Sequence, residues 1–135
     1  SRQTQSLHRL GTDNLEGENM SNNLSMNAYQ AEASKTGIYR WKVIYPALGL
    51  SNEAGEVLGK IKKLIRDKDI TFNEIGDLPG ADRAAIADEI GDVLWYCAML
   101  AKDLNISLNE VANMNLEKLE SRAARGKIGG SGDDR

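Results

Sequence analysis

The chain has 135 residues, enough for one domain with a modest hydrophobic core, and 41% of its residues are hydrophobic. Its formal net charge of -3 excludes the broad basic surface that a nucleic-acid polymer requires. The single cysteine, Cys97, excludes a disulfide framework and favours a reducing, cytoplasmic location. No apolar run reaches the roughly 18 residues that a membrane helix needs, so we expect a soluble protein that does not bind membranes.

The first segment, residues 1–22, is rich in Ser, Asn, Gly and charged residues and has no hydrophobic periodicity. Such a composition cannot bury enough apolar surface to fold, so we expect a disordered tail. The chain does not begin with Met and Met20 can serve as a start, so we expect part of this tail to be foreign to the natural protein. The tail contains the one histidine, His8, which we do not expect to bind a metal.

Residues 23–125 are expected to form one helical domain. Apolar residues at helical spacing predict helices over about residues 24–36, 46–66, 82–105 and 107–126. Gly37 is a candidate C-cap of the first helix, Pro46 suits the first turn of the second, and Ser107 with Glu110 forms a capping box for the fourth. Turn-forming residues predict a loop insertion at 67–82, and residues 126–135 read as a flexible tail. The predicted fold class is all-α, a four-helix bundle.

The second and third predicted helices carry the same acidic pattern. When EAGEVLGKIKKL (53–64) is laid over EIGDVLWYCAML (89–100), Glu53 matches Glu89 and Glu56 matches Asp92. At 3.6 residues per turn, each pair of acids lies at the border of an apolar stripe. If these stripes pack against each other in antiparallel helices, the four carboxylates converge on one place.

Four carboxylates withdrawn from water repel one another, so a cation is needed to neutralise them. Because the ligands on offer are oxygens, the expected cofactor is a hard divalent cation, Mg2+, with Mn2+ as a substitute. The sequence lacks the Glu-x-x-His pairs of di-iron bundles and the phosphate-binding loop of P-loop proteins, which excludes both kinds of site. An acidic helix face that is merely solvated is the alternative interpretation.

Basic side chains accompany the acids and are suited to a polyphosphate, with a metal on one side and charged donors on the other. The candidates are Lys60 and Lys63 in the second helix and Asn115, Lys118, Arg122 and Arg125 in the fourth. Charge balancing on a wet helix surface is the alternative for all of them.

Aromatic side chains offer flat surfaces on which a nucleotide base could stack. The candidates are Tyr29, Trp41 and Tyr96, whereas Trp95 is expected to pack inside the protein because it lies opposite the acids on its helix. Gly55, Gly59 and Gly91 interrupt the two acidic helices, and a glycine inside a helix suggests a close approach of another helix. We therefore expect an oligomer with helices packed across its interface.

The motif Glu53-x-x-Glu56 with Glu89-x-x-Asp92, in the settings LGLSNEAGEV and ADEIGDVLWY, resembles that of the MazG-type, all-α nucleoside triphosphate pyrophosphohydrolases. The resemblance covers about residues 26–135. It includes NLEKLESR and the terminal GGSGD, which resemble short single-domain bacterial and phage members. The interval between the acid pairs, residues 57–88, is longer than is common in the family and leaves the insertion at 67–82 without an assigned role.

The resemblance implies a helical bundle that forms an obligate dimer or a dimer of dimers. It implies hydrolysis of nucleoside triphosphates to monophosphate and pyrophosphate, in nucleotide-pool control or house-cleaning, and likeness to phage proteins suggests a preference for dGTP. By this resemblance Glu53, Glu56, Glu89 and Asp92 hold Mg2+, Glu53 or Glu56 takes the proton of the attacking water, and Lys60, Lys63, Asn115, Lys118 and Arg122 bind the phosphates.

Two alternatives to this activity are open. One is a related reaction, such as that of a dUTPase-like enzyme or a phosphoribosyl-ATP pyrophosphohydrolase. The other is a helical module without catalytic activity that binds nucleotides or a partner protein.

Overall fold

The computed structural model describes residues 23–71 and 77–130. These ranges contain four α-helices, α2 (Met26–Ser34), α3 (Ile44–Lys68), α4 (Gly80–Asp103) and α5 (Leu108–Ala124). They contain no β-strand, which confirms the all-α prediction. None of the helices in these ranges has the length and apolar character to cross a membrane. The predicted tail at 1–22, residues 72–76 of the predicted insertion and residues 131–135 lie outside the described residues.

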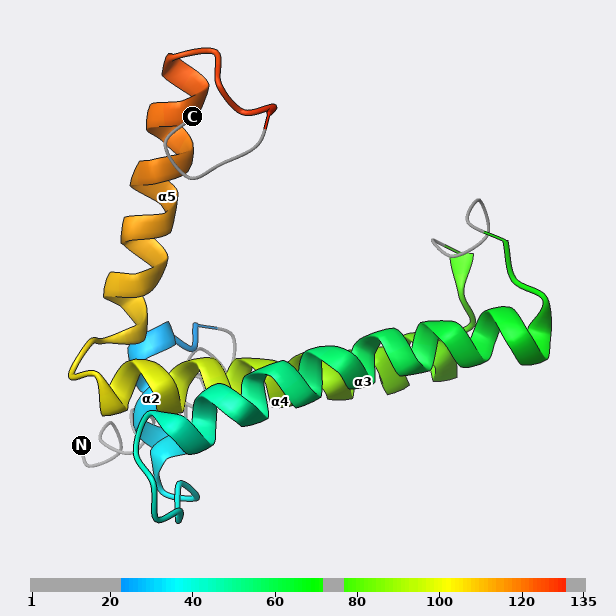
Figure 1. Ribbon diagram of the computed structural model, residues 1–135, viewed down its shortest axis with the longest axis horizontal. Coiled ribbons are helices and arrows are strands. Elements are labelled where there is room, and N and C mark those ends of the chain that lie inside the picture. The colour runs from blue at the N-terminus through cyan, green and yellow to red at the C-terminus, as the bar shows by residue number, and fades with distance from the viewer. Residues whose placement is uncertain (1–22, 72–76, 131–135) are drawn as a thin grey trace, which may run out of the picture.

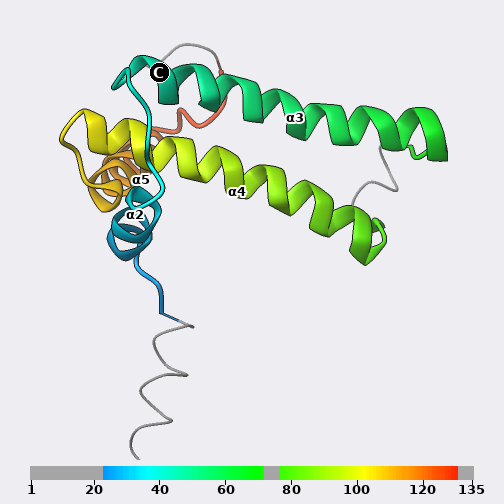
Figure 2. The same cartoon turned by 90° about the horizontal axis from the view of Figure 1, so that it is seen from below.

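Helices α3 and α4 lie side by side in opposite directions and form a long hairpin (Figures 1 and 2). At its far end the apolar side chains of Leu64 and Leu78 are buried, and the Lys68 ammonium lies 2.8 Å from the Asp82 carboxylate. Both helices extend further into the predicted insertion than expected, so the connection is confined to residues 69–79. α3 ends there because Asp69 adopts a left-handed conformation with φ of 52°.

The buried core lies at the other end of the hairpin, where α2 and α5 pack against α4. Ala98 and Met99 are fully buried, and Ala101 and Leu108 complete the cluster. Gly37 belongs to this packing rather than to a helix cap, because a Cβ atom there would lie 2.8 Å from the sulfur of Met99. The expectation that Gly37 caps α2 is therefore wrong, and Lys35 occupies the C-cap.

Side chains of α2 fix where α5 begins. The amide nitrogen of Gln30 donates to the carbonyls of Ala98 and Ile106 at 3.1 and 3.2 Å, and its oxygen accepts from the Leu108 N–H at 3.1 Å. Asn27 accepts from the next N–H of α5, at Asn109, at 3.0 Å. The first turn of a helix has N–H groups without intrahelical partners, and α2 supplies partners for two of them.

The hydroxyl of Ser107 accepts from the Glu110 N–H at 3.1 Å, which confirms the predicted N-cap of α5. With its first turn held in this way, α5 leaves the junction at a steep angle to the hairpin (Figure 1). Within the described ranges it packs on α2 and α4 and does not reach α3. The helices of one chain are thus more open than the closed four-helix bundle that we expected.

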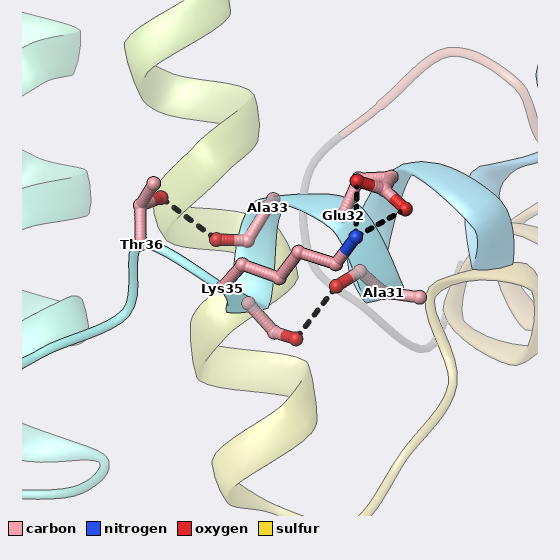
Figure 3. A network of polar contacts seen from close by, with 6 residues as sticks. Ala31, Glu32, Ala33, Lys35 and Thr36 are labelled. Atoms are coloured by element: carbon pink, nitrogen blue, oxygen red, sulfur yellow. Dashed lines mark hydrogen bonds and ion pairs between the residues drawn. The ribbon is translucent and has the colours of Figure 1, made fainter.

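The end of α2 is tied to α4 through Thr36. Figure 3 shows the Thr36 hydroxyl donating to the Ala33 carbonyl at 2.8 Å, beside the ion pair between Lys35 and Glu32. The same hydroxyl accepts from the indole N–H of Trp95 at 3.0 Å. Trp95 therefore serves packing and anchoring, as predicted from its position on α4.

The chain enters α3 through a tight turn that α4 holds in place. The N–H of Ile44 donates to the Lys42 carbonyl at 2.7 Å, which closes a three-residue turn around Val43 at φ of 66°. A β-branched residue rarely adopts a positive φ because its side chain crowds the backbone. Asp103 stabilises the turn, since its carboxylate accepts from the Val43 N–H and from the Tyr39 hydroxyl, both at 2.8 Å.

Candidate metal and phosphate site

Three acids from both helices of the hairpin meet near the middle of its length. Glu53 comes from α3, and Glu89 and Asp92 come from α4. One carboxylate oxygen of each lies within 4.8 Å of the other two. The cause is the sequence pattern described above, because apolar stripes that pack in antiparallel helices bring the acids at their borders together. Glu53 and Glu89 are half-buried and Asp92 is exposed.

The spacing of these oxygens suits a small divalent cation. Mg2+ holds oxygen ligands at about 2.1 Å in an octahedron, so ligands on opposite sides are about 4.2 Å apart. Adjacent ligands are about 3.0 Å apart, so oxygens within 4.8 Å of one another need to move closer by no more than about 2 Å to share one ion. All three are carboxylates, the ligand type that Mg2+ and Mn2+ prefer, so the residues fit the cation that the sequence suggested.

Glu56, the fourth acid of the paired motif, lies outside this group of three. Its side chain is exposed, and one of its carboxylate oxygens lies 3.8 Å from the position of a Cβ atom at Gly59 on the same helix. It is one helical turn from Glu53 and is therefore near the cluster. The geometry distinguishes three converging carboxylates from a fourth that lies at their margin.

Lys60 lies within reach of the acids. Its ammonium is 3.3 Å from a carboxylate oxygen of Glu89, whose side chain is 15% exposed while that of Lys60 is 37% exposed. Lys63 is exposed on α3 and contributes to lowering the pKa of Asp67, after the hydrogen bond from Arg66 to that carboxylate. The two lysines thus have different surroundings, and only Lys60 is paired with an acid of the cluster.

A group of four aromatic rings, Tyr39, Tyr45, Trp95 and Tyr96, follows the acids along the hairpin toward the junction. The rings of Tyr45 and Tyr96 have centroids 6.1 Å apart, and those of Trp95 and Tyr96 are 5.0 Å apart. A Cβ atom at Gly49 would overlap the ring of Tyr96, so this ring lies directly on the backbone of α3. Tyr96 therefore packs between the helices.

The acids also influence the pKa of the Tyr96 phenol. Its pKa is raised by hydrogen bonding with Tyr45 and by burial, and further by the carboxylates of Glu53 and Asp92. The pKa of Tyr29 on α2 is raised by burial first and then by Asp92. Both phenols therefore hold their protons to a higher pH than an ordinary tyrosine does, and a neutral phenol can donate a hydrogen bond.

Comparison with known proteins identifies the family to which the chain belongs. A family model described as the MazG nucleotide pyrophosphohydrolase domain matches residues 46–126. The chain belongs to the MazG family. The matched range contains both acid pairs, so the carboxylates that converge lie inside the family domain. Membership implies that this MazG chain is a nucleotide pyrophosphohydrolase.

A second comparison supports the short phage type. The chain is 41% identical over 122 residues to the protein of Mycobacterium phage L5 named "Gene 37 protein", in an alignment that covers 83% of this chain and 100% of that relative. No solved structure matches the chain significantly.

The predicted phosphate-binding residues of α5 lie apart from the acids of their own MazG chain. Asn115 and Lys118 are exposed on α5, which does not contact α3 within the described ranges. Arg122 is 6% exposed. The prediction that this basic strip faces the four acids does not hold within one subunit, because the capped first turn of α5 directs the helix away from the hairpin (Figure 1).

The predicted base-binding residues of the MazG chain differ in exposure. Tyr29 packs against the buried core around Ala98 and Met99, and Tyr96 packs on Gly49. Trp41, by contrast, is 66% exposed in the segment between α2 and α3. Sequence analysis missed Tyr45 and Gly49, which shape the surroundings of Tyr96. A signal was present, because Tyr45, Gly49 and Glu53 recur every four residues and so lie on one strip of α3.

Proposed function

We propose that this MazG-family chain hydrolyses nucleoside triphosphates or deoxynucleoside triphosphates to monophosphate and pyrophosphate in a Mg2+-dependent reaction. The observation that carries the proposal is the convergence of Glu53, Glu89 and Asp92 from two helices of the family domain. Three carboxylates at this separation suit a cation, and a cation bound there suits the phosphate chain of a nucleotide.

In the proposed reaction Glu53, Glu89 and Asp92 would hold Mg2+, and the bound cation would neutralise charge on the phosphate oxygens. Glu53 or Glu56 accepts a proton from the attacking water, whose oxygen forms a bond to the α-phosphorus. The bond from that phosphorus to the oxygen bridging to the β-phosphate breaks, and pyrophosphate leaves with the electron pair. Lys60 and Lys63 neutralise the charge that develops on the leaving group.

Glu56 is either a fourth metal ligand or the base, and a substitution distinguishes the two roles. Glu56→Ala is expected to remove activity without unfolding the chain, because the side chain is exposed and covers no core residue. If Glu56 is the base, Mn2+ binding persists in this variant, whereas loss of a ligand weakens that binding. Full turnover by the variant would exclude both roles.

We further propose that the active form is a dimer or a dimer of dimers. Large apolar side chains are exposed on both helices of the hairpin and on α5, among them Leu58, Ile90, Leu94, Met114, Leu116 and Leu119. A Cβ atom at Gly55 or Gly91 would meet nothing within 4 Å in the described parts of the chain, although a glycine inside a helix costs stability. Both features are explained if another subunit packs on this surface.

An assembly also gives the basic strip of α5 a role. The helix that carries Asn115, Lys118 and Arg122, α5, does not contact α3 within the described ranges and extends away from the hairpin (Figure 1). In the proposed oligomer the exposed Asn115 and Lys118 bind phosphates at the acidic cluster of a neighbouring subunit, and Arg122, which is 6% exposed, joins them only if its side chain leaves its buried position. Tyr29, Trp41 and Tyr96 are the proposed contacts for the base, and Tyr96 acts through its hydroxyl or its edge because its ring packs on Gly49.

The test is a screen of the eight common ribonucleoside and deoxyribonucleoside triphosphates with the purified full-length chain. We expect Mg2+-dependent release of pyrophosphate, with dGTP among the preferred substrates. Release of orthophosphate would point to cleavage elsewhere in the triphosphate. Thermal stabilisation by nucleotides without any product would indicate a module that binds nucleotides and does not catalyse.

A further inference from the structure

Lys60 occupies a position that its proposed role in phosphate binding does not explain. Its ammonium lies against Glu89, 3.3 Å from a carboxylate oxygen, and not in the solvent beyond the acidic cluster. Glu89 is also one of the three acids whose oxygens converge. The same carboxylate therefore has a cation partner from its own protein and a position suited to a metal ion.

These two partners compete with each other on electrostatic grounds. Two positive charges that share one carboxylate lie only about 4–5 Å apart, and at this separation their repulsion is considerable even at the effective dielectric constant of a protein surface. Glu89 is 15% exposed, so water screens the charges only in part. A divalent ion that binds Glu89 would therefore weaken the ion pair and favour displacement of the ammonium group.

The displaced ammonium has somewhere to go. A lysine has a flexible four-carbon side chain, and the 37% exposure of Lys60 shows that its path to solvent is open. A polyphosphate bound to the metal would present new negative charge on the same side of the cluster. The nucleotide would then receive the group that the metal has displaced.

We propose that Lys60 is an internal counter-ion that competes with the divalent cation for Glu89 and moves to the phosphate chain when metal and nucleotide bind together. The inference rests on the proposed function of the acidic cluster as a metal site. Its consequence is that metal alone binds weakly, while metal and nucleotide strengthen the binding of each other, because the nucleotide relieves the competition.

The test is a titration of the full-length protein with Mn2+ alone, without nucleotide, in which free Mn2+ is followed by electron paramagnetic resonance. Lys60→Met removes the competing charge, so we expect Mn2+ to bind about three- to tenfold more tightly than to the unaltered chain. Lys60→Arg keeps a cation beside Glu89 and should bind Mn2+ as the unaltered chain does. Circular dichroism verifies that each variant is folded.

Lys62→Met is the matched control, because it removes the same charge from an exposed position on the same helix. It measures the effect of net charge alone, which we expect to be less than about twofold at ordinary ionic strength. Equal Mn2+ affinities of the Lys60→Met and Lys62→Met proteins would overturn the role of Lys60 while leaving the metal site intact. Failure of the unaltered chain to bind Mn2+ would instead overturn the metal site and the inference together.

Steady-state kinetics provide a second test, in which the Mg2+ requirement and KM for the nucleotide change in opposite directions. At a nucleotide concentration well below KM, where the nucleotide does not itself relieve the competition, the Mg2+ concentration for half-maximal activity should fall in Lys60→Met. At saturating Mg2+, KM for the nucleotide should rise in the same variant, because a phosphate contact is lost. A purely structural ion pair would move neither quantity in this way. An unchanged Mg2+ requirement together with a raised KM would leave Lys60 as a phosphate ligand only and would contradict the competition.

Discussion

Two regions of this small chain, the helix junction and the middle of the hairpin, differ in how their polar groups are paired. At the junction of α2, α4 and α5, the Gln30 amide donates hydrogen bonds to two carbonyls and accepts one from an N–H group. Met99 is fully buried in the same region. Halfway along the hairpin, Glu53, Glu89 and Asp92 have been brought together although they repel one another. The polar groups of the junction are satisfied within one chain, whereas the acidic cluster is suited to a cation from outside the chain.

This difference separates the residues that stabilise the fold from those that serve the reaction. A satisfied hydrogen-bond network lowers the free energy of the folded chain, so its removal should cost stability. Carboxylates that gather in one place repel one another and raise that free energy, so their removal is expected to cost activity and not stability. Substitutions at the two regions are therefore expected to have opposite signatures.

The largest effect is expected at the acids. Asp92→Asn keeps the shape of the side chain and removes its charge, so we expect the rate of pyrophosphate release to fall about a hundredfold or more. The free energy of unfolding should stay unchanged or rise by up to about 1 kcal/mol, because repulsion among the carboxylates decreases. Steady-state kinetics and urea denaturation of the same preparation measure both quantities.

Asp88→Asn is the control for this prediction, since Asp88 is an exposed acid of α4 outside the convergent group. It makes the same change of charge, and we expect it to leave the rate within about twofold. Similar rates for the two variants would remove Asp92 from the site.

The next largest effect is expected at the junction. Gln30→Ala deletes three hydrogen bonds and leaves the Ile106 carbonyl and the Leu108 N–H in a partly buried setting. We expect a loss of about 2–3 kcal/mol in the free energy of unfolding, at roughly 1 kcal/mol for each bond. Asn27→Ala deletes one bond to the same helix end, so it should cost about 1 kcal/mol or less. Equal losses for both variants would show that Gln30 does not hold the junction together.

Much of this architecture follows from local sequence rules. The apolar periodicity located all four helices, and Ser107 with Glu110 marked the start of α5. The prediction that Gly37 caps α2 was wrong. A glycine is needed there because a side chain would collide with the sulfur atom of Met99, which is far away in the sequence. The direction of α5 could not be predicted from the sequence either. It depends on the side chains of Asn27 and Gln30 in α2, which accept hydrogen bonds from N–H groups about 80 residues away in the sequence.

The convergence of the acids could be anticipated from the sequence because it needs only helical spacing and antiparallel packing. Three of the four predicted carboxylates meet, while Glu56 lies at the margin. The pairing of Lys60 with Glu89 could not be anticipated, because helical spacing placed Lys60 beside Glu56 on its own helix. Side-chain pairs across two helices depend on the exact register of the hairpin, which periodicity leaves open.

A smaller effect, on self-association, is expected from a substitution that tests whether another subunit packs on the α3–α4 hairpin. Gly91→Ala adds a methyl group that meets nothing within 4 Å in the described parts of the chain. In an isolated chain it would stabilise α4 by about 0.5–1 kcal/mol through helix propensity. If a neighbouring subunit packs there, the methyl group collides with it, and we expect the dissociation constant of the oligomer to rise about tenfold.

Sedimentation velocity at several concentrations measures this dissociation constant. Gly80→Ala, at the equally open first turn of α4, serves as the comparison and should leave self-association unchanged. A Gly91→Ala chain that is more stable and associates as before would place the interface elsewhere.

The smallest expected effect concerns the turn before α3, where the hydroxyl of Tyr39 donates to Asp103. Burial and this bond to a carboxylate raise the pKa of Tyr39 to about 12, from an ordinary value of 10.0. The folded chain thus favours the neutral phenol, so its contribution to stability is fully present below pH 10 and is lost as the pH rises toward 12. Tyr39→Phe removes the contribution at every pH.

We therefore expect Tyr39→Phe to cost about 1 kcal/mol of unfolding free energy at pH 8. The difference between the two chains should shrink steadily above pH 10, because there the unaltered protein alone must keep a proton that its unfolded state releases. Urea denaturation of both chains from pH 8 to pH 11 measures the trend, and the subtraction cancels the titration of the other tyrosines and the lysines. A difference that does not change with pH would mean that the Asp103 carboxylate holds the turn through the Val43 N–H alone, and that the phenol contributes only its packing on Tyr45.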